Sequence, residues 1–464
     1  MSQTVPAHRP PDPAAGPLPV ASWADTGRVL AGAVLPIVAQ GAILRRRRVV
    51  ALAGRLRTDD RGVRILQRMR ERYGPGPLRL RVPGRSMAVV LDRPDVARVL
   101  SETPEPFAPA NREKRGALGH FQPHAVLISS GEARADRRRF NESVLDSGTP
   151  VHSQATAMVR AAREEAALVR AAADGSGRLD WDTLFVGWWR VVRRTVLGDG
   201  ARDDAELTDM LETLRSAGNW AYLRPHGGTR ALRERFDTRL RAHVDRAEPG
   251  SLAAMFAAAP GSAVTDPAGQ VPHWLFAYDA AGAANMRALA LLAAHPEEAG
   301  RVRAESGAGD PSGPRELPRL RAAVLEALRL WPTTPLLLRD STVETRWAGA
   351  PLPAGSALLI PTWYFHRDDR SRPDADRFAP DQWLDAGGRE DRAVEDWSSM
   401  PFSGGPGTCP ARELVLFTTS TFLAAVLDGR AHRVDPSVLH GSRPLPRGLD
   451  PFTLSLAVSP SSPV

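Results

Sequence analysis

Hydrophobic periodicity divides the chain into a short strand-rich part and a long helical part. Two extended runs, "PLRLRVPG" and "MAVVLD", are separated by a Gly-Arg-Ser turn and predict neighbouring strands between residues 77 and 92. Beyond them, apolar positions recur at the helical spacing of three and four in the segments 94–100, 154–173, 179–198 and 206–223. The pattern therefore predicts a mainly α protein with a small β portion.

The most apolar long segment, residues 271–305, predicts a central helix. From Trp274 to Ala294 it is apolar on nearly every side, which is typical of a helix through the middle of a large protein. Pro296 permits a break, and a further helix is predicted over 317–332. Extended runs follow at 335–349 and 355–363, then a long irregular stretch from 366 to 402 and a final helix from residue 411.

The first fifty residues carry two different patterns. Residues 1–25 are rich in proline and alanine without periodicity, so we expect a disordered lead-in. The apolar run 29–44 precedes four arginines but is shorter than the ~20 residues of a spanning helix and contains Pro36 and Gln40. We therefore expect an interfacial or packed segment over 26–50, with peripheral membrane contact as an option, and one continuous domain over 51–464.

Composition narrows the class of partner. The net charge is +8, and almost all basic residues are arginines, Lys114 being the only lysine. These charges are spread among many acidic residues, which argues against nucleic-acid binding and fits an acidic protein partner. With one cysteine, Cys409, the chain has neither a disulfide framework nor a zinc site of three or four thiolates, so we expect a reducing, cytoplasmic location and a monomer.

Cys409 lies in the glycine-rich stretch "PFSGGPGTCPAR", directly before the last predicted helix. Glycines there permit a tight backbone path, and free N–H groups at a helix start favour thiolate over thiol. A thiolate in a dry loop rich in donors suits the proximal side of a haem iron. A buried, inert thiol is the alternative interpretation.

Three ordered motifs resemble the cytochrome P450 family. "FSGGPGTCPA" resembles its cysteine-ligand loop FxxGxxxC through Phe402, Gly405 and Cys409, and "EALR" at 326–329 matches its ExxR helix. The segment between them, "HRDDRSRPDADRFAPDQWL", resembles the stretch that ends in a PERF or PERW box. The likeness covers about residues 70 to 440 and implies a bacterial member of the family, of actinobacterial origin. It also implies the cytochrome P450 fold and haem b (iron protoporphyrin IX) with Cys409 as metal ligand.

The resemblance assigns a structural role to Glu326 and Arg329, which are three apart on one helix face and can form a charge-assisted pair. Buried, such a pair would fix the irregular stretch against the helix; exposed, it would contribute little. Gln382 stands where the family usually has arginine in the box. We expect the family's triad to be weakened, or rebuilt by Arg377.

The resemblance also implies arginines for the haem propionates. It points to Arg339 beyond the ExxR helix and to Arg138 in "GEARADRRRF", where Arg134 replaces an aromatic residue or histidine. Gly407 stands where a basic residue is expected two positions before the cysteine. One usual propionate contact is therefore expected to be missing.

In "AYDAAGAANMRALALL" we identify the family's oxygen-activating helix, whose usual pattern is AGx(D/E)T. In this alignment Ala281 and Gly282 approach the cofactor, and Ala284 and Asn285 replace the acid and the alcohol that relay protons. Asn285 can hold a water but cannot cycle a proton near neutral pH. Asp279 is expected to point elsewhere.

The expected function follows from the resemblance. The substrate pocket is predicted from Phe276, Ala277, Leu336 and Leu337, with lids from 107–130 and 220–223, and it suits a small hydrophobic molecule. We expect a monooxygenase of secondary metabolism that takes electrons from ferredoxin and ferredoxin reductase. A peroxygenase, a non-oxidative isomerase or cyclase, and a catalytically silent haem- or ligand-binding protein remain as alternatives.

Overall fold

Helices make up most of the fold, as expected from the sequence. The structure is a computed structural model, and it describes residues 17–220, 226–391 and 397–461. The α-helices are Trp23–Val29 (α1), Leu35–Ala39 (α2), Arg47–Arg55 (α3), Thr58–Tyr73 (α4), Arg93–Ser101 (α5), Arg112–Leu118 (α6), Gly131–Val144 (α7), Ala155–Ser176 (α8), Trp181–Leu197 (α9), Ala205–Gly218 (α10), Arg230–Arg246 (α11), Pro267–Ala294 (α12), Pro296–Gly307 (α13), Pro318–Leu330 (α14), Thr362–Arg367 (α15) and Arg412–Leu427 (α16).

Short helical turns connect several of these elements. A π-helix, Leu30–Val34 (η1), joins α1 to α2. The 3-10 turns are Val126–Ile128 (η2), Asp199–Ala201 (η3), His226–Thr229 (η4), Ala253–Met255 (η5), Pro380–Trp383 (η6), Gly405–Gly407 (η7) and Pro451–Thr453 (η8).

The strands form three small sheets in the described part of the chain. They are Leu78–Leu80 (β1), Met87–Val89 (β2), Phe107–Ala108 (β3), Arg178–Asp180 (β4), Leu336–Ser341 (β5), Thr345–Trp347 (β6), Ala350–Leu352 (β7), Ala357–Pro361 (β8), Arg430–Val434 (β9) and Ser455–Pro460 (β10). The largest sheet has the order β1-β2-β8-β5-β3. β5 and β8 are antiparallel, with Leu336 opposite Pro361. The prediction of a mainly α fold with a small β portion is confirmed.

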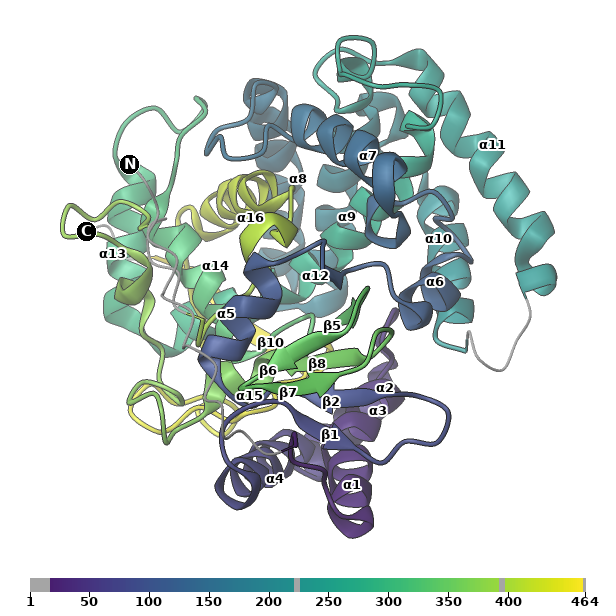
Figure 1. Ribbon diagram of the computed structural model, residues 1–464. Coiled ribbons are helices and arrows are strands. Elements are labelled where there is room, and N and C mark those ends of the chain that lie inside the picture. The colour runs from purple at the N-terminus through teal and green to yellow at the C-terminus, as the bar shows by residue number, and fades with distance from the viewer. Residues whose placement is uncertain (1–16, 221–225, 392–396, 462–464) are drawn as a thin grey trace.

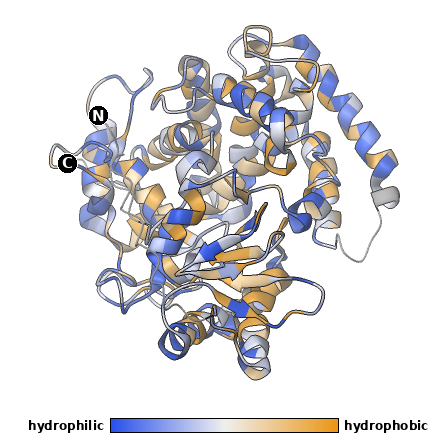
Figure 2. Ribbon diagram, in the orientation of Figure 1, coloured by the Kyte–Doolittle hydropathy of each residue, from blue (hydrophilic) through white to orange (hydrophobic). Residues whose placement is uncertain are grey.

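The fold has two apolar cores. The larger core joins α8, α9, α12, α14 and α16, and the smaller one lies between the N-terminal helices and the five-stranded sheet. α12 crosses the centre of Figure 1, while α1 and α4 lie below the sheet. Figure 2 shows apolar residues gathered on the sheet and central helices, whereas the outer helix α11 carries many hydrophilic ones.

Capping residues and prolines set the ends of the helices that frame the centre. Asp266 caps α12 by accepting from the N–H of Gly269, and α12 ends before Pro296, where α13 begins. α14 starts at Pro318 and ends at Leu330, two residues before Pro332. Proline fits a first helical turn and disfavours the helical conformation in the residue before it, so these breaks are consistent with the sequence.

The N-terminal segment packs on the rest of the fold. The backbone N–H of Ala21 donates to the carbonyl of Arg79 at 2.9 Å, and Tyr73 on α4 donates its hydroxyl to Asp25 on α1 at 2.7 Å. The apolar run predicted as interfacial or packed forms η1 and α2, with Ala33 and Ile37 buried in the smaller core. Most of the predicted lead-in, residues 1–16, lies outside the described part. Among the described residues, no helix is both long enough and apolar enough to cross a membrane.

Candidate haem site

The cysteine loop leads from the irregular stretch into α16. The N–H of Cys409 donates to the carbonyl of Phe402 at 2.9 Å, and the N–H of Thr408 donates to that of Gly405 at 3.0 Å. These bonds fold the loop into a tight cradle, and the thiol, Phe402 and Thr408 face a cavity of about 720 Å³. The loop therefore presents the thiol to an enclosed space.

Two glycines of the loop have different reasons to be glycine. Gly405 has a φ of +58°, and a β-carbon there would lie 2.4 Å from the carbonyl oxygen of Leu100, so only glycine fits. Gly405 shapes the loop but does not line the cavity. A β-carbon at Gly407 would lie 3.1 Å from a guanidinium nitrogen of Arg339. The space left by the missing basic side chain at position 407 is therefore next to Arg339.

Burial opposes the thiolate at Cys409. Enclosure by protein raises the pKa of the thiol, and the N–H of Ala411 with the charges of Arg138 and Arg412 lower it without overcoming the burial. The N–H at the helix start therefore favours thiolate, as expected, but its effect is smaller than that of burial. Because a metal ligand must be deprotonated, an iron ion would have to supply the remaining stabilisation.

The Glu326–Arg329 pair is fully buried. Arg329 donates two hydrogen bonds to the Glu326 carboxylate, at 2.8 and 2.5 Å, and neither side chain has exposed surface. Arg329 also donates to four main-chain carbonyls of the irregular stretch, those of His366, Asp374, Ala375 and Arg377. The pair thus ties α14 to the stretch that precedes the cysteine loop.

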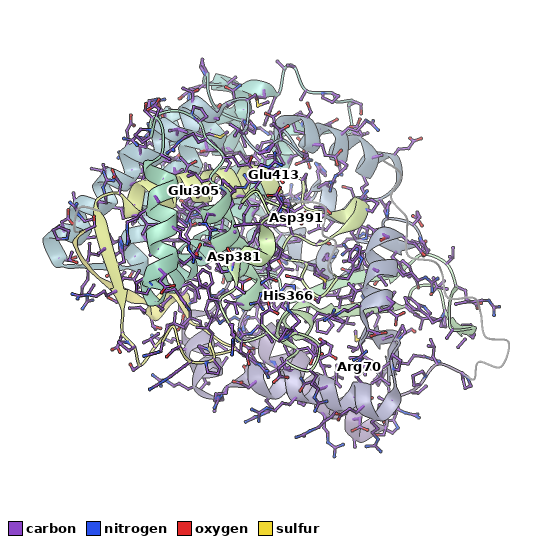
Figure 3. The ribbon with its side chains drawn as sticks, turned by 90° about the vertical axis from the view of Figure 1, so that its left-hand side faces the viewer. Arg70, Glu305, His366, Asp381, Asp391 and Glu413 are labelled. Atoms are coloured by element: carbon purple, nitrogen blue, oxygen red, sulfur yellow. The ribbon has the colours of Figure 1, made fainter. Side chains whose placement is uncertain are left out.

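His366 forms a second link between α14 and that stretch. Its Nδ1 lies 3.1 Å from the carbonyl oxygen of Arg329, and its Nε2 accepts from the N–H of Met400 at 2.9 Å. Burial lowers the pKa of His366 to about 3, so the ring is neutral. Figure 3 labels His366 in one view together with Asp381 of η6 and Glu413 of α16. The chain just before the cysteine loop is therefore fixed to α14 at two places.

The third member of the buried motif differs from the expectation. Gln382 donates to Glu326 at 2.9 Å, and its carbonyl oxygen accepts from the Arg372 guanidinium at 2.5 Å. Arg377 contributes a main-chain carbonyl to Arg329 rather than a guanidinium to Glu326. The prediction that Arg377 rebuilds the triad is therefore wrong, and Arg372 supplies the cation through Gln382.

Four cations gather on the cysteine side of the cavity wall. Arg339 is buried on β5 and donates to Thr103 and Ser403, both at 3.2 Å, while Lys114 on α6 donates only to the carbonyls of Pro109 and Leu338. Burial lowers the pKa of Arg339 to about 10, with Arg134 adding to the effect, and burial also lowers the pKa of Lys114.

Arg134 and Arg138 on α7 complete this group. The Nε of Arg134 is buried without a hydrogen-bond partner in the described chain, and burial followed by the charge of Arg138 lowers the pKa of Arg134. Arg138 donates to the carbonyl of Thr408 at 2.8 Å and to Glu142 at 2.5 Å. Glu142 pairs with Arg138, whereas Arg134 and Arg339 form no ion pair with a carboxylate of the described residues, so positive charge remains beside the cysteine loop.

The opposite wall comes from one face of α12. Its lining residues recur at helical spacing and are His273, Phe276, Ala277, Asp279, Ala280, Ala281, Ala283, Ala284 and Arg287. Small side chains at four of five successive positions bring the helix backbone close to the cavity. The space between α12 and the cysteine loop is bounded on one side by alanine and on the other by the thiol.

The structure corrects two residues predicted for this wall. A β-carbon at Gly282 would meet Phe185 and Trp188 of α9, so Gly282 faces that helix rather than the cavity. Asn285 is completely buried, does not line the cavity and has no hydrogen-bond partner for its amide among the described residues. At about 100° per residue, these positions lie on the side of α12 turned away from the wall.

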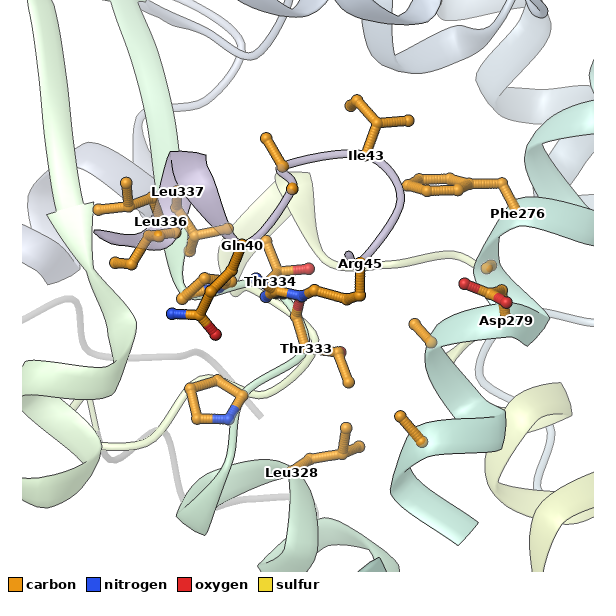
Figure 4. A pocket seen from close by; sticks show the side chains of 18 of the residues that line it. Gln40, Ile43, Arg45, Phe276, Asp279, Leu328, Thr333, Thr334, Leu336 and Leu337 are labelled. Atoms are coloured by element: carbon orange, nitrogen blue, oxygen red, sulfur yellow. Dashed lines mark hydrogen bonds between the residues drawn. The ribbon is translucent and has the colours of Figure 1, made fainter. Parts of the chain in front are cut away.

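Asp279, expected to point elsewhere, belongs to the wall. Its Oδ2 accepts from Arg215 of α10 at 2.6 Å, and its side chain retains 23% of its exposure toward the cavity. Figure 4 shows the carboxylate projecting from α12 into the pocket beside Phe276. The residue that follows, Ala280, has no hydroxyl. The acid is therefore in the wall, and the alcohol is absent.

The predicted pocket residues line the same cavity. Phe276, Ala277, Leu336 and Leu337 all contribute. From the first predicted lid the cavity is lined by Pro109, Glu113, Lys114, Ala117, Leu118, Val126 and Leu127. Of the second lid, residues 221–223 lie outside the described part. The guanidinium carbon of Arg46 lies over the Trp220 ring, 4.3 Å from the ring centroid. The lining away from the cysteine is mainly apolar.

Several polar lining residues escaped the prediction from sequence, among them Asp279, His273, Arg287 and Arg45. A signal existed for Asp279, because it is the single acidic residue of the long, apolar α12. Such an acid must be paired or functional when it is buried. No comparable signal marks Arg45, which is one of four consecutive arginines.

A haem fits the residues present. The thiol can ligate iron, the alanine face of α12 leaves room for a flat ring, and the unpartnered Nε of Arg134 lies among cations suited to carboxylates. Cys409 would hold the metal, and Arg134, Arg138 and Arg339 would hold the propionates.

Comparisons with known proteins agree with this geometry. The family model described as "Cytochrome P450" matches residues 283–438. Cyclooctat-9-en-7-ol 5-monooxygenase of Streptomyces melanosporofaciens is 27% identical over 380 residues, which is 74% of this chain and 80% of that relative. Dimethylnonatriene synthase of Zea mays is 35% identical over 163 residues, 32% of this chain and 30% of its own length.

A solved structure has a similar fold. A retinoic acid-bound cyanobacterial CYP120A1 matches with a TM-score of 0.66 and 17% sequence identity, covering 85% of this chain and 94% of that one. Identity at this level speaks for the fold alone.

Proposed function

The chain belongs to the cytochrome P450 family and takes haem as cofactor, and from that premise we propose that it is a haem-thiolate monooxygenase that oxidises a small hydrophobic molecule. The observation that carries the proposal is a cavity with Cys409 and several cations on one wall and the alanine face of α12 on the other. When bound, the haem supplies dioxygen binding and electron transfer. The side chains that line the cavity would bind the substrate and handle protons.

We propose Asp279, rather than Ala284 or Asn285, as the acid that handles protons in the cavity. Its Oδ2 is held by Arg215, while its Oδ1 accepts no hydrogen bond from the described residues and can bind a water in the cavity. A carboxylate can both take and give a proton, which the Asn285 amide cannot. Because Ala280 offers no hydroxyl, an ordered water or a substrate hydroxyl has to occupy that place.

The cavity lining supports the substrate class. Ile43, Phe276, Leu336 and Leu337 offer apolar surface, which suits a hydrophobic molecule. The name of one relative points the same way, since it is called a monooxygenase of cyclooctat-9-en-7-ol.

We propose that separate proteins, a ferredoxin and its reductase, deliver the electrons in the cytoplasm. Support comes from α7, where Arg138 contacts the cysteine loop through Thr408 and the next residue, Arg139, is 62% exposed. An exposed arginine beside the metal-ligand loop would attract an acidic partner.

The thiolate assignment is tested by Cys409→Ser. We expect the reduced, carbon-monoxide-bound wild type to show the Soret shift typical of a thiolate ligand, and the variant to lose it, because a serine hydroxyl is a much poorer iron ligand. The measurement is the absorbance spectrum at equal haem content. Persistence of the shifted band in the variant would refute Cys409 as the ligand.

A further inference from the structure

A polar corner interrupts the apolar lining of the cavity. It consists of Gln40 and Arg45 from the N-terminal segment and of Thr333 and Thr334, which follow α14. Figure 4 shows these side chains close together, with Ile43, Leu336 and Leu337 nearby. All four face the part of the cavity to which Ile43, Leu336 and Leu337 contribute apolar side chains.

Arg45 has unused hydrogen-bonding capacity. Its single hydrogen bond with the described residues is a long one, from Nη2 to the carbonyl of Thr333 at 3.3 Å, although a guanidinium has five N–H donors. The Gln40 side-chain amide forms no hydrogen bond with the described residues. These donors can therefore bind an acceptor that enters the cavity.

The loop that carries Arg45 is held in place before any ligand arrives. The N–H of Arg46 donates to the carbonyl of Gln40 at 2.8 Å. The Asn219 side chain at the end of α10 accepts from the N–H groups of Ile43 and Leu44 and donates to the carbonyl of Leu44 at 2.8 Å. A fixed loop loses less entropy when its arginine binds a ligand.

The charges around Arg45 favour an anion with one negative charge. Two carboxylates, Asp59 and Asp279, attract Arg45 through space, but Asp279 is already paired with Arg215. Asp59 also faces the cations Arg287 and Arg367. One carboxylate group is therefore compatible with this corner, whereas a dianion such as a phosphate ester would be repelled by Asp59 and Asp279.

We propose that Arg45, assisted by Gln40 and Thr334, binds the carboxylate of the substrate, so that the enzyme acts on an apolar carboxylic acid. The proposal rests on the proposed function, since it names the substrate class of that site. The hydrocarbon part would then contact Ile43, Leu336 and Phe276, and the carboxylate would stay with the N-terminal segment.

The test compares two ligands that differ in charge, dodecanoate and methyl dodecanoate, by isothermal titration calorimetry with the haem-loaded protein. We expect the wild type to bind dodecanoate at least about tenfold more tightly than the ester. Arg45→Gln should weaken dodecanoate binding by about 10- to 100-fold and leave ester binding within about twofold, as for the loss of a charge-assisted hydrogen bond.

Arg48→Gln is the matched control, because Arg48 belongs to the same arginine run but is exposed and does not line the cavity. It should bind both ligands as the wild type does. Gln40→Leu provides a second variant should Arg45→Gln fail to fold, with an expected selective loss of about threefold to tenfold for dodecanoate.

Equal affinity of the wild type for both ligands, or equal weakening of both by Arg45→Gln, would overturn the proposal and leave Arg45 as a structural partner of Asp59. The carbon-monoxide spectrum of the same samples separates this outcome from failure of the proposed function. A normal thiolate spectrum without carboxylate selectivity would refute only the role of Arg45.

Discussion

Replacing Asp279 with asparagine is expected to lower the rate of product formation by about 100-fold, the size of effect that general acid–base groups usually supply. Asparagine keeps the shape of the side chain and can still accept from Arg215, but it cannot take or give a proton. Substrate affinity should therefore change little. The measurements are the turnover number, the product formed per electron consumed and the solvent deuterium isotope effect, which should increase.

Two threonine variants serve as controls for this assignment on α12. Ala280→Thr places a hydroxyl next to Asp279 on the wall of the cavity, so we expect more product per electron consumed. Asn285→Thr changes a buried residue outside the wall and should leave that ratio unchanged. The contrary result is that Asn285→Thr alters coupling while Asp279→Asn does not. In that case the group that handles protons would have to be sought near Ala284 and Asn285, the positions first predicted from sequence.

These positions show why the site could be found from the sequence, whereas the face of α12 that lines the cavity could not. The cysteine loop and the ExxR helix could be recognised because their chemistry lies in residues close together in the chain. The wall of α12 depends on rotation of the helix about its axis, and that rotation is fixed by distant contacts such as Gly282 against Trp188. A run of small residues from Ala280 to Ala284 offers no side chain that distinguishes one face from another.

The same limit applies to charged residues. From the sequence alone, four consecutive arginines are expected to be exposed to solvent. In the structure Arg45 lines the cavity, whereas Arg48 is exposed. The bonds that turn this loop come from Asn219, more than 170 residues away in sequence. Likewise, the cation that supports Gln382 is Arg372 and not Arg377, because the path of an irregular stretch is set by its tertiary contacts rather than by a repeating pattern.

Replacing Arg329 with leucine is expected to lower the free energy of unfolding by about 3–5 kcal/mol, because it leaves Glu326 as an unpaired charge in a fully buried position. The loss also removes the donor of four main-chain carbonyls in the stretch before the cysteine loop. Haem retention should therefore fall together with stability. Denaturant unfolding monitored by circular dichroism, with haem content measured in parallel, checks both effects.

A matched control for this prediction is Arg230→Leu. Arg230 forms a salt bridge with Glu234 on the surface of α11, where both side chains are more than half exposed, 75% and 61%. Such an exposed pair contributes little to stability, and its loss should leave haem content unchanged. If Arg329→Leu cost no more than this control, the carboxylate of Glu326 would have to be satisfied by Gln382, Trp383 and the N–H of Ala379 alone, and the cation would be dispensable.

The double replacement of Glu326 and Arg329 by leucine separates the cost of the unpaired charge from the loss of the bonds to the main-chain carbonyls. If the unpaired charge is the main cost, the double variant should be more stable than Arg329→Leu alone.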